Sequence, residues 1–176
     1  MKKLVLGLSV LFMTGQLFAQ TTTTDITPRN SWLKAGVTAG LPVGDLSDVS
    51  NFVLGVDLKG QVMETKNFGF GIATGYDHYF SKDNFKDFGT IPLGIFGRYY
   101  PQNNGFFAGT DLGYSFVTGL EDANGGLYIK PQIGYHNYNW NFFGYYNNIF
   151  RNKDDGGNMG HAGIGVTYNI RFNKTK

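Results

Sequence analysis

The sequence predicts an all-β protein, an eight-stranded antiparallel up-and-down transmembrane β-barrel. Three observations lead to this fold class. Apolar and polar residues alternate with a period of two in segments that recur along the chain. The connections between these segments are alternately long and short. An export signal precedes them, and no later apolar run reaches the length of about 18 residues that a membrane-spanning helix needs.

Residues 1–19 have the layout of a secretory signal peptide. Two lysines form a short positive region, the stretch from Leu4 to Phe12 is apolar, and Ala19 is a small residue suited to cleavage. We therefore expect the mature chain to begin at Gln20. Of the 15 Lys and Arg residues, two lie in this signal, which leaves 13 to balance the 13 Asp and Glu residues. A balanced chain offers no basic surface for nucleic acid.

The composition favours strands. Its 16 Phe and 11 Tyr residues are typical of strands, and its 26 Gly residues supply turns. The chain has no cysteine, so neither a disulfide framework nor a lipid on an N-terminal cysteine can hold the protein in place. Attachment to a membrane then has to come from the fold itself.

A polar lead-in at residues 20–31 precedes the expected barrel, which covers residues 32–172 and is followed by a short tail at 173–176. In the first strand Leu33, Ala35, Val37, Ala39 and Leu41 alternate with Lys34, Gly36, Thr38 and Gly40. In the second strand Phe52, Leu54, Val56 and Leu58 alternate with Val53, Gly55, Asp57 and Lys59. Such alternation is typical of strands with one apolar face.

Five further strands are expected near residues 67–79, 88–100, 105–117, 126–137 and 140–148. The segment at 140–148 is aromatic on both faces, so its orientation is left open. The last strand is the clearest, because Ile164, Val166, Tyr168, Ile170 and Phe172 alternate with Gly163, Gly165, Thr167, Asn169 and Arg171. No segment with a helical period competes with these strands.

The connection lengths indicate the topology. Long connections lie at residues 42–51, 80–87, 118–125 and 149–160, and short ones at 64–67, 101–104 and 137–139. This alternation is typical of outer-membrane barrels, which have short periplasmic turns and longer external loops, so both termini would be periplasmic. The acidic runs in the last two long connections lack the oxygen spacing of a calcium loop and are interpreted as solvated loops.

The apolar face of the strands can point inward or outward. An inward face gives a soluble calyx for a small apolar ligand, lined by Leu33, Val37, Leu54 and Ile164, and an outward face gives a membrane barrel with a polar interior. Aromatic residues near the strand ends favour the membrane barrel, because such residues form belts at membrane interfaces. These residues are Trp32, Tyr76, Tyr79, Phe80, Tyr99, Tyr100, Tyr114, Phe116, Tyr135, Tyr138 and Trp140, although some must face the interior.

Several motifs resemble those of a known family. They are Phe18-Ala19-Gln20, Ile91-Pro92-Leu93-Gly94, Arg98-Tyr99-Tyr100-Pro101 and the closing segment from Gly165 to Phe172. The chain resembles the small OmpX/OmpA-type outer-membrane barrels, especially the outer-membrane β-barrel domain proteins of Bacteroidota. The resemblance implies that Gly165, Tyr168, Ile170 and Phe172 belong to the C-terminal signal read by the barrel-insertion machinery. The chain departs from the family in the four residues that follow Phe172.

The polar face predicts a lumen filled by charged side chains. Its members are Lys34, Asp57, Lys59, Asp77, Arg98, Asp111, Lys130 and Arg171. Eight strands enclose a space that side chains can fill, and an unpaired charge there is costly. We therefore expect Lys59, Arg98, Lys130 and Arg171 to meet Asp57, Asp77 and Asp111, which would close the lumen to ions.

Nothing in the sequence has the pattern of an enzyme, and no cofactor or metal site is expected. Ser115 and His136 share the inward face but would lie about 25 Å apart at opposite ends of their strands. A rim group of His161, Asp77 and Ser115 is geometrically conceivable, as is an outward pair of His78 and Ser81. Isolated histidines at a barrel rim are more often interfacial polar groups than catalysts.

The expected function is a structural or interaction role in the outer membrane, exerted through the external loops. Outer-membrane lipid, the insertion machinery during assembly, and a protein or surface ligand at the loops are the expected partners. The alternative is a soluble calyx or minor transporter for a small apolar ligand.

Overall fold

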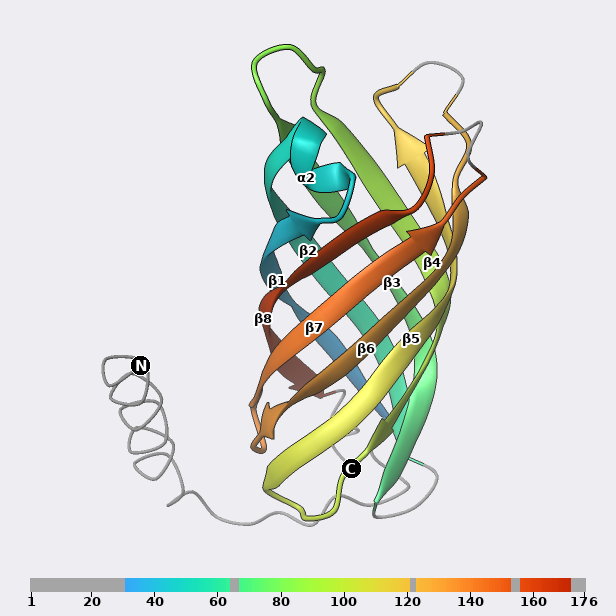
Figure 1. The fold of residues 1–176 in the computed structure, drawn as a ribbon. Coiled ribbons are helices and arrows are strands. Elements are labelled where there is room, and N and C mark those ends of the chain that lie inside the picture. The colour runs from blue at the N-terminus through green and yellow to red at the C-terminus, as the bar shows by residue number, and fades with distance from the viewer. Residues whose placement is uncertain (1–30, 64–66, 121–122, 153–155, 172–176) are drawn as a thin grey trace, which may run out of the picture.

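The computed structural model describes residues 31–63, 67–120, 123–152 and 156–171, which form one closed eight-stranded antiparallel barrel (Figure 1). This confirms the predicted fold class. The expected signal peptide at 1–19, the cleavage region, Phe172 and the tail at 173–176 lie outside the described residues. So does the lead-in up to residue 30, whereas Ser31 already belongs to the first strand.

The strands follow one another around the barrel in chain order. They are β1 (Ser31–Val43), β2 (Ser50–Met63), β3 (Phe68–Ser81), β4 (Phe88–Tyr99), β5 (Gly105–Thr118), β6 (Gly126–His136), β7 (Trp140–Phe150) and β8 (Met159–Arg171). Each strand pairs with the next, and β8 pairs with β1 from Trp32 opposite Arg171 to Val43 opposite Gly160. The closed ladder leaves no edge strand, so every strand has a partner on both sides.

The two ends of the barrel differ in their connections. One end, called here the loop end, carries the connections at residues 44–49, 82–87, 119–125 and 151–158. The other, called the turn end, carries those at 64–67, 100–104 and 137–139. The predicted long–short alternation is therefore present. Strand β1 begins and strand β8 ends at the turn end.

A four-residue helix, α2 (Leu46–Val49), lies in the first connection of the loop end (Figure 1). It was not predicted, because four residues are too few to show a helical period. Gly44 has a positive φ of 65°, and its carbonyl accepts hydrogen bonds from the backbone and the hydroxyl of Ser47. Leu46 is buried, which holds the helix over the mouth of the barrel. No helix in the described part of the chain is long and apolar enough to cross a membrane.

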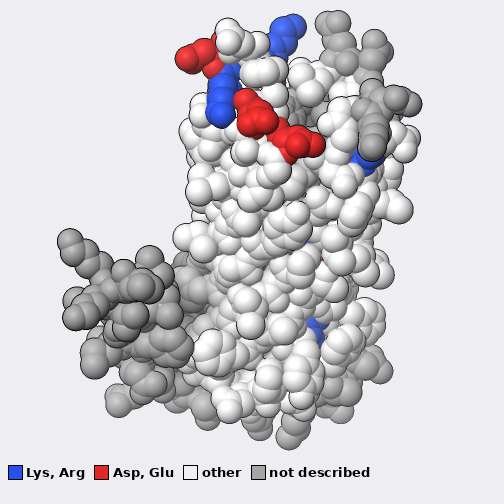
Figure 2. Space-filling view, in the orientation of Figure 1, with Lys and Arg blue, Asp and Glu red and all other residues white. Residues whose placement is uncertain are grey.

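The apolar faces of the strands point outward. Ile164 is 72% exposed, Ile72 67% and Leu127 66%. On the face of the barrel wall that Figure 2 shows, charged residues are almost absent, and they gather at the loop end instead. The alternative of a soluble calyx is wrong, because Val37, Leu54 and Ile164, its expected lining, lie on this outer surface.

The orientation of β7, which the sequence left open, follows from its burial. Asn141, Phe143, Tyr145, Asn147 and Ile149 are buried, whereas Trp140, Phe142, Tyr146 and Phe150 are exposed. Period-two alternation is therefore kept, with aromatic rings on both faces. The inward rings fill space that smaller residues on neighbouring strands leave empty.

Candidate functional site

The middle of the lumen contains a network of ion pairs. Lys59 Nζ lies 3.1 Å from Asp57 Oδ2 and 2.5 Å from Asp111 Oδ2. Lys130 Nζ lies 3.3 Å from the same Asp57 oxygen. All four side chains are almost completely buried. Two ammonium groups and two carboxylates thus balance one another in a layer that spans strands β2, β5 and β6.

The turn-end half of the lumen holds two buried cations, Lys34 and Arg98. Lys34 Nζ donates hydrogen bonds to the side-chain oxygens of Asn141 at 3.2 Å and Asn169 at 2.7 Å. Arg98 donates to Gln132 Oε1 at 2.8 Å, and its guanidinium lies over the ring of Phe107, 4.6 Å from the centroid. Amide oxygens and an aromatic ring are thus among the partners of these two cations.

The position of Arg98 differs from the expected pairing. None of the ion pairs among the described residues involves Arg98. The register of β4 and β5 explains why Arg98 and Asp111 are not paired. Arg98 lies opposite Gly109 near the turn end, whereas Asp111 lies opposite Phe96, two residues closer to the loop end. Arg171 pairs with Trp32 in the backbone ladder, and its side chain lies outside what the structure describes.

The loop-end half of the lumen contains Asp77, His161 and Tyr79. Asp77 Oδ1 accepts a hydrogen bond from Thr38 Oγ1 at 3.5 Å, and Asp77 Oδ2 lies 4.0 Å from His161 Nε2. The other ring nitrogen of His161 lies 3.1 Å from Tyr79 Oη. Tyr79 and Tyr100 are fully buried, so these two aromatic residues belong to the lumen and not to an interfacial belt.

Almost no free volume remains beside the ion-pair layer. A cavity of about 10 Å³ touches Asp57, Asp77, Asp111 and Lys130. This is about the volume that a single water molecule needs. This cavity beside the ion-pair layer is therefore too small for more than one water molecule.

The candidate catalytic residues are not brought together with one another. Ser115 lies opposite Gly126 at the loop end, and His136 lies opposite Gly105 at the turn end. His78 Nδ1 contacts Tyr76 Oη at 3.1 Å, and its Nε2 lies 3.5 Å from Asp87 Oδ2, while Ser81 donates to the carbonyl of Lys86. Of the rim group only Asp77 and His161 approach each other, and their neighbour is Tyr79.

Within the described ranges, no group of three or more His, Asp or Glu side chains is placed to hold a metal ion. The acidic residues of the loop end do not converge on one point there. Asp45 and Asp48 belong to the first connection, and Asp83 and Asp87 to the second. All four are exposed.

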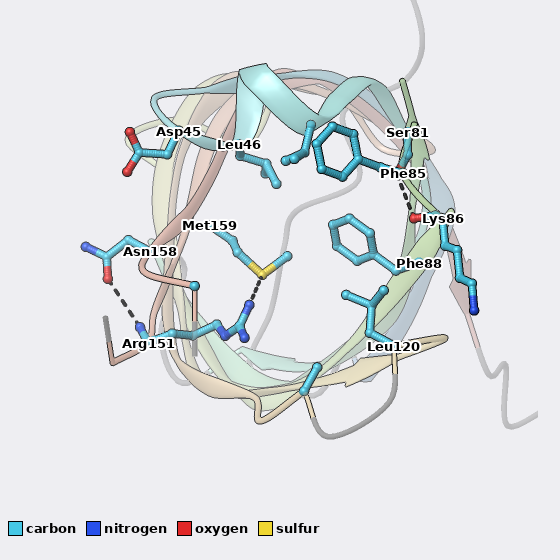
Figure 3. Close-up of a pocket in the computed structure, with 13 residues that line it drawn as sticks. Asp45, Leu46, Ser81, Phe85, Lys86, Phe88, Leu120, Arg151, Asn158 and Met159 are labelled. Carbon is cyan, nitrogen blue, oxygen red and sulfur yellow. Dashed lines mark hydrogen bonds between the residues drawn. The ribbon is translucent and has the colours of Figure 1, made fainter. Parts of the chain in front are cut away.

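A cavity of about 530 Å³, called here the mouth cavity, lies at the loop end (Figure 3). It is lined by Asp45, Leu46, Val49, Ser81, Phe85, Lys86, Phe88, Leu120, Ala123, Arg151, Gly156, Asn158 and Met159. Three of the apolar lining residues, Leu46, Phe88 and Met159, are buried and are called here the floor of the cavity. The floor belongs to an apolar cluster that includes Val53, Tyr79, Tyr128 and Ile149. This cluster separates the mouth cavity from the charged layers.

The polar residues around the mouth cavity point in different directions. Arg151 Nη1 donates to Met159 Sδ at 3.0 Å, which brings the guanidinium against the floor (Figure 3). The side chains of Lys86 and Asp45 point away from the cavity in the same view. The Arg151 guanidinium therefore lies against the apolar lining of the cavity.

Sequence reasoning did not identify the mouth cavity. Its apolar residues come from four separate connections and strand ends, so no single segment contains the pattern. One signal was present, because Leu46, Phe85 and Leu120 are large apolar residues within connections that are otherwise polar. Apolar residues in loops on a rigid scaffold often mark a binding surface.

An apolar exterior around a filled, charged interior defines the class of this protein, an integral β-barrel of the outer-membrane type. Several solved structures match its fold, two of them as follows. The attachment invasion locus protein Ail of Yersinia pestis matches with a TM-score of 0.58 at 12% identity, over 82% of this chain and 100% of that chain. Neisserial surface protein A matches with a TM-score of 0.53 at 16% identity, over 80% of this chain and 97% of that chain.

These matches confirm, at the level of the fold, the expected resemblance to small outer-membrane barrels. At such identities they say nothing about a shared activity. No family model matches the chain, and no curated protein matches it either.

Proposed function

We propose that this protein is an outer-membrane scaffold with a closed lumen, and that its loop end faces the outside of the cell and binds a partner molecule there. The observation that carries the proposal is the contrast between the two parts of the interior. Charged and aromatic side chains fill the middle, whereas the loop end keeps a cavity of about 530 Å³. An eight-stranded barrel has an interior that side chains can fill, whereas small molecules bind in concave cavities.

The closed lumen argues against a transport role. An ion passing through the barrel would have to separate Lys59 from both carboxylates, and breaking a buried pair leaves charges without compensation. A small molecule entering the mouth cavity would meet the apolar floor first. The scaffold is therefore proposed as a binding protein and not as an enzyme or a porin.

The loop end supplies the chemistry for recognition. Asp45, Asp48, Lys82, Asp83, Lys86 and Asp87 are exposed there, so two of the loop-end connections carry charges of both signs beside the mouth cavity. A rigid barrel holds these connections at fixed positions, which lowers the entropy that binding costs. Outer-membrane lipid would contact the apolar wall, and a protein or surface ligand would contact the loop end.

The last strand is proposed as the element that the insertion machinery reads. Tyr168 and Ile170 are exposed on its outer face, and Gly165 lies on its inner face. Phe172, the fourth residue of the signal, lies outside the described residues. Substituting Tyr168 and Ile170 together by serine should therefore lower the amount of protein inserted in the membrane.

Conductance in planar lipid bilayers tests the closed lumen. The mature protein should insert without producing current steps above the leak, because the ion-pair layer fills the barrel. A sixteen-stranded porin inserted under the same conditions provides the positive control, since its lumen is an aqueous channel. Regular current steps from the pure protein would contradict the scaffold proposal.

A further inference from the structure

We propose that a groove on the outer wall of the barrel holds one acyl chain of a lipid from the surrounding bilayer as a resident ligand. The groove, called here the wall groove, crosses the outer faces of β2, β1, β8 and β7, which are neighbours in the barrel. The inference goes beyond the proposed function, because that function concerns the loop end and this site lies on the wall.

Two hollows that share residues make up the wall groove. The larger has a volume of about 700 Å³ and the smaller one of about 360 Å³, and volumes of this size are typical of small-molecule sites. Ala39, Leu54 and Ile164 line both hollows, so the two meet there. The smaller hollow continues to Leu41, toward the loop end, and the larger one to Phe142, toward the turn end.

Small residues on the outer face create the wall groove. Ala39 of β1 and Gly144 of β7 both lie opposite Ile164 of β8 in the strand ladder. Ile164 is 72% exposed, so it stands out between two positions with little or no side chain. At Gly144 a Cβ atom would meet only one carbonyl, at 3.9 Å. The lining of the larger hollow also includes three residues without side chains, Gly55, Gly134 and Gly165.

The chemistry of the lining favours a hydrocarbon chain. Every side chain that lines the two hollows is apolar except that of Thr38. Thr38 is only 4% exposed, and its hydroxyl donates to Asp77 Oδ1 inside the lumen. A polar ligand in the wall groove would therefore lose its hydrogen bonds to water without gaining a side-chain partner there, whereas an alkyl chain loses none.

The location of the wall groove identifies the bilayer as the source of the chain. The groove is continuous with the exposed apolar wall, which membrane lipid contacts in a barrel of this type. Lipid tails are as apolar as the side chains of the wall, so the hydrophobic effect does not distinguish a bound chain from its neighbours. Shape does, because a chain in a hollow has protein atoms on several sides and an unfilled hollow loses those dispersion contacts.

Shape also favours a lipid chain over a second copy of the protein. The outer wall of a closed barrel is convex, so a second barrel would touch the residues that stand out, such as Ile164. It would leave the positions of Ala39 and Gly144 uncovered. A chain of methylene groups is narrow and flexible, so it can lie along both hollows and cover these positions.

Nuclear Overhauser effects from lipid to protein give the first test. The mature chain, deuterated except at the δ1 methyl groups of isoleucine, is held in nanodiscs of palmitoyl-oleoyl-phosphatidylcholine. Ile164 reports on the wall groove, and Ile95 of β4 is the internal control, since it is 64% exposed and does not line either hollow. Lipids in rapid exchange would contact both methyl groups alike. A resident chain should make the effect at Ile164 about threefold stronger than at Ile95.

Native mass spectrometry of protein released from the same nanodiscs gives the second test, because it counts retained lipid. The unchanged protein should keep one phosphatidylcholine molecule. Ala39→Leu should keep none, since the larger side chain fills the place where the two hollows meet. Ala108→Leu is the matched control and should keep one, because Ala108 is likewise an exposed alanine on a strand but lines neither hollow. Gel mobility in SDS with and without heating checks the folding of both variants.

Three results would overturn the inference. One is an equal effect at Ile164 and Ile95 in the unchanged protein, and another is a lipid count that Ala39→Leu leaves as it was. The third is a dimer without lipid, which would mean that a second copy covers the wall groove. None of these results bears on the scaffold proposal, which fails instead on conductance or on inverted orientation.

Discussion

Lys59 is the residue on which most of the buried charge depends. Its ammonium group contacts the carboxylates of Asp57 and Asp111, which come from β2 and β5, and only 1% of its side chain is exposed. Asp57 also contacts Lys130, whereas Lys59 is the cation that the two carboxylates share, so its loss removes charge compensation from both. The single lysine therefore links two sides of the barrel.

Replacing Lys59 with methionine should lower the free energy of unfolding by about 3–5 kcal/mol, because two buried carboxylates lose their shared partner. Urea unfolding of the protein in lipid vesicles measures the change. Lys82→Met is the control, since Lys82 is exposed in a connection and its replacement should change stability by no more than about 0.5 kcal/mol. Equal stability of both variants would argue that the lumen network contributes little.

At the scale of elements, glycines on the lumen face allow neighbouring strands to approach. Gly94 of β4 lies opposite Gly113 of β5, and a Cβ atom at either position would overlap the backbone of the other strand. Gly144 of β7 lies on the outer face, where a Cβ atom would meet only open space and one carbonyl at 3.9 Å. The two kinds of glycine thus have different roles in the same sheet.

Gly94→Ala should destabilise the barrel by about 1–3 kcal/mol, since the added methyl group forces β4 and β5 apart. Gly144→Ala should be neutral or stabilise by up to about 1 kcal/mol, because it only reduces the freedom of the unfolded chain. The same urea titration compares the pair. If both variants behaved alike, the close approach at Gly94 would not limit the packing of these strands.

The strands could be predicted because a period of two is a local property of the sequence. The orientation of β7 could not, since Phe142 and Phe143 are equally apolar and face opposite sides. The alternation of faces also predicted that Arg98 points into the lumen. It could not predict which residues Arg98 contacts, because contacts across the lumen depend on the stagger between strands. The mouth cavity depends on connections far apart in the chain, which no local pattern describes.

For the whole molecule, the alternation of long and short connections predicts the orientation in the membrane. The chain has no cysteine, so a single introduced cysteine reports on one position. Gly156→Cys places a thiol at the loop end, and Gln102→Cys places one at the turn end, both at exposed positions. A membrane-impermeant maleimide should label the first in intact cells and the second only after the outer membrane is opened. The reverse pattern would mean that the loop end faces the periplasm.

The contacts in the lumen have a consequence for how the barrel is made. Lys59 and Asp111 are 52 residues apart in the chain, and Asp57 and Lys130 are 73 apart, so neither pair joins neighbouring strands. A nascent sheet of four strands, β1 to β4, contains Asp57 and Lys59 but neither Asp111 nor Lys130. Half-built intermediates therefore expose charges that must stay hydrated. We therefore expect the barrel to form in one cooperative step. Strands β1 and β8 should pair only after Asp111 of β5 and Lys130 of β6 have replaced the water around Asp57 and Lys59.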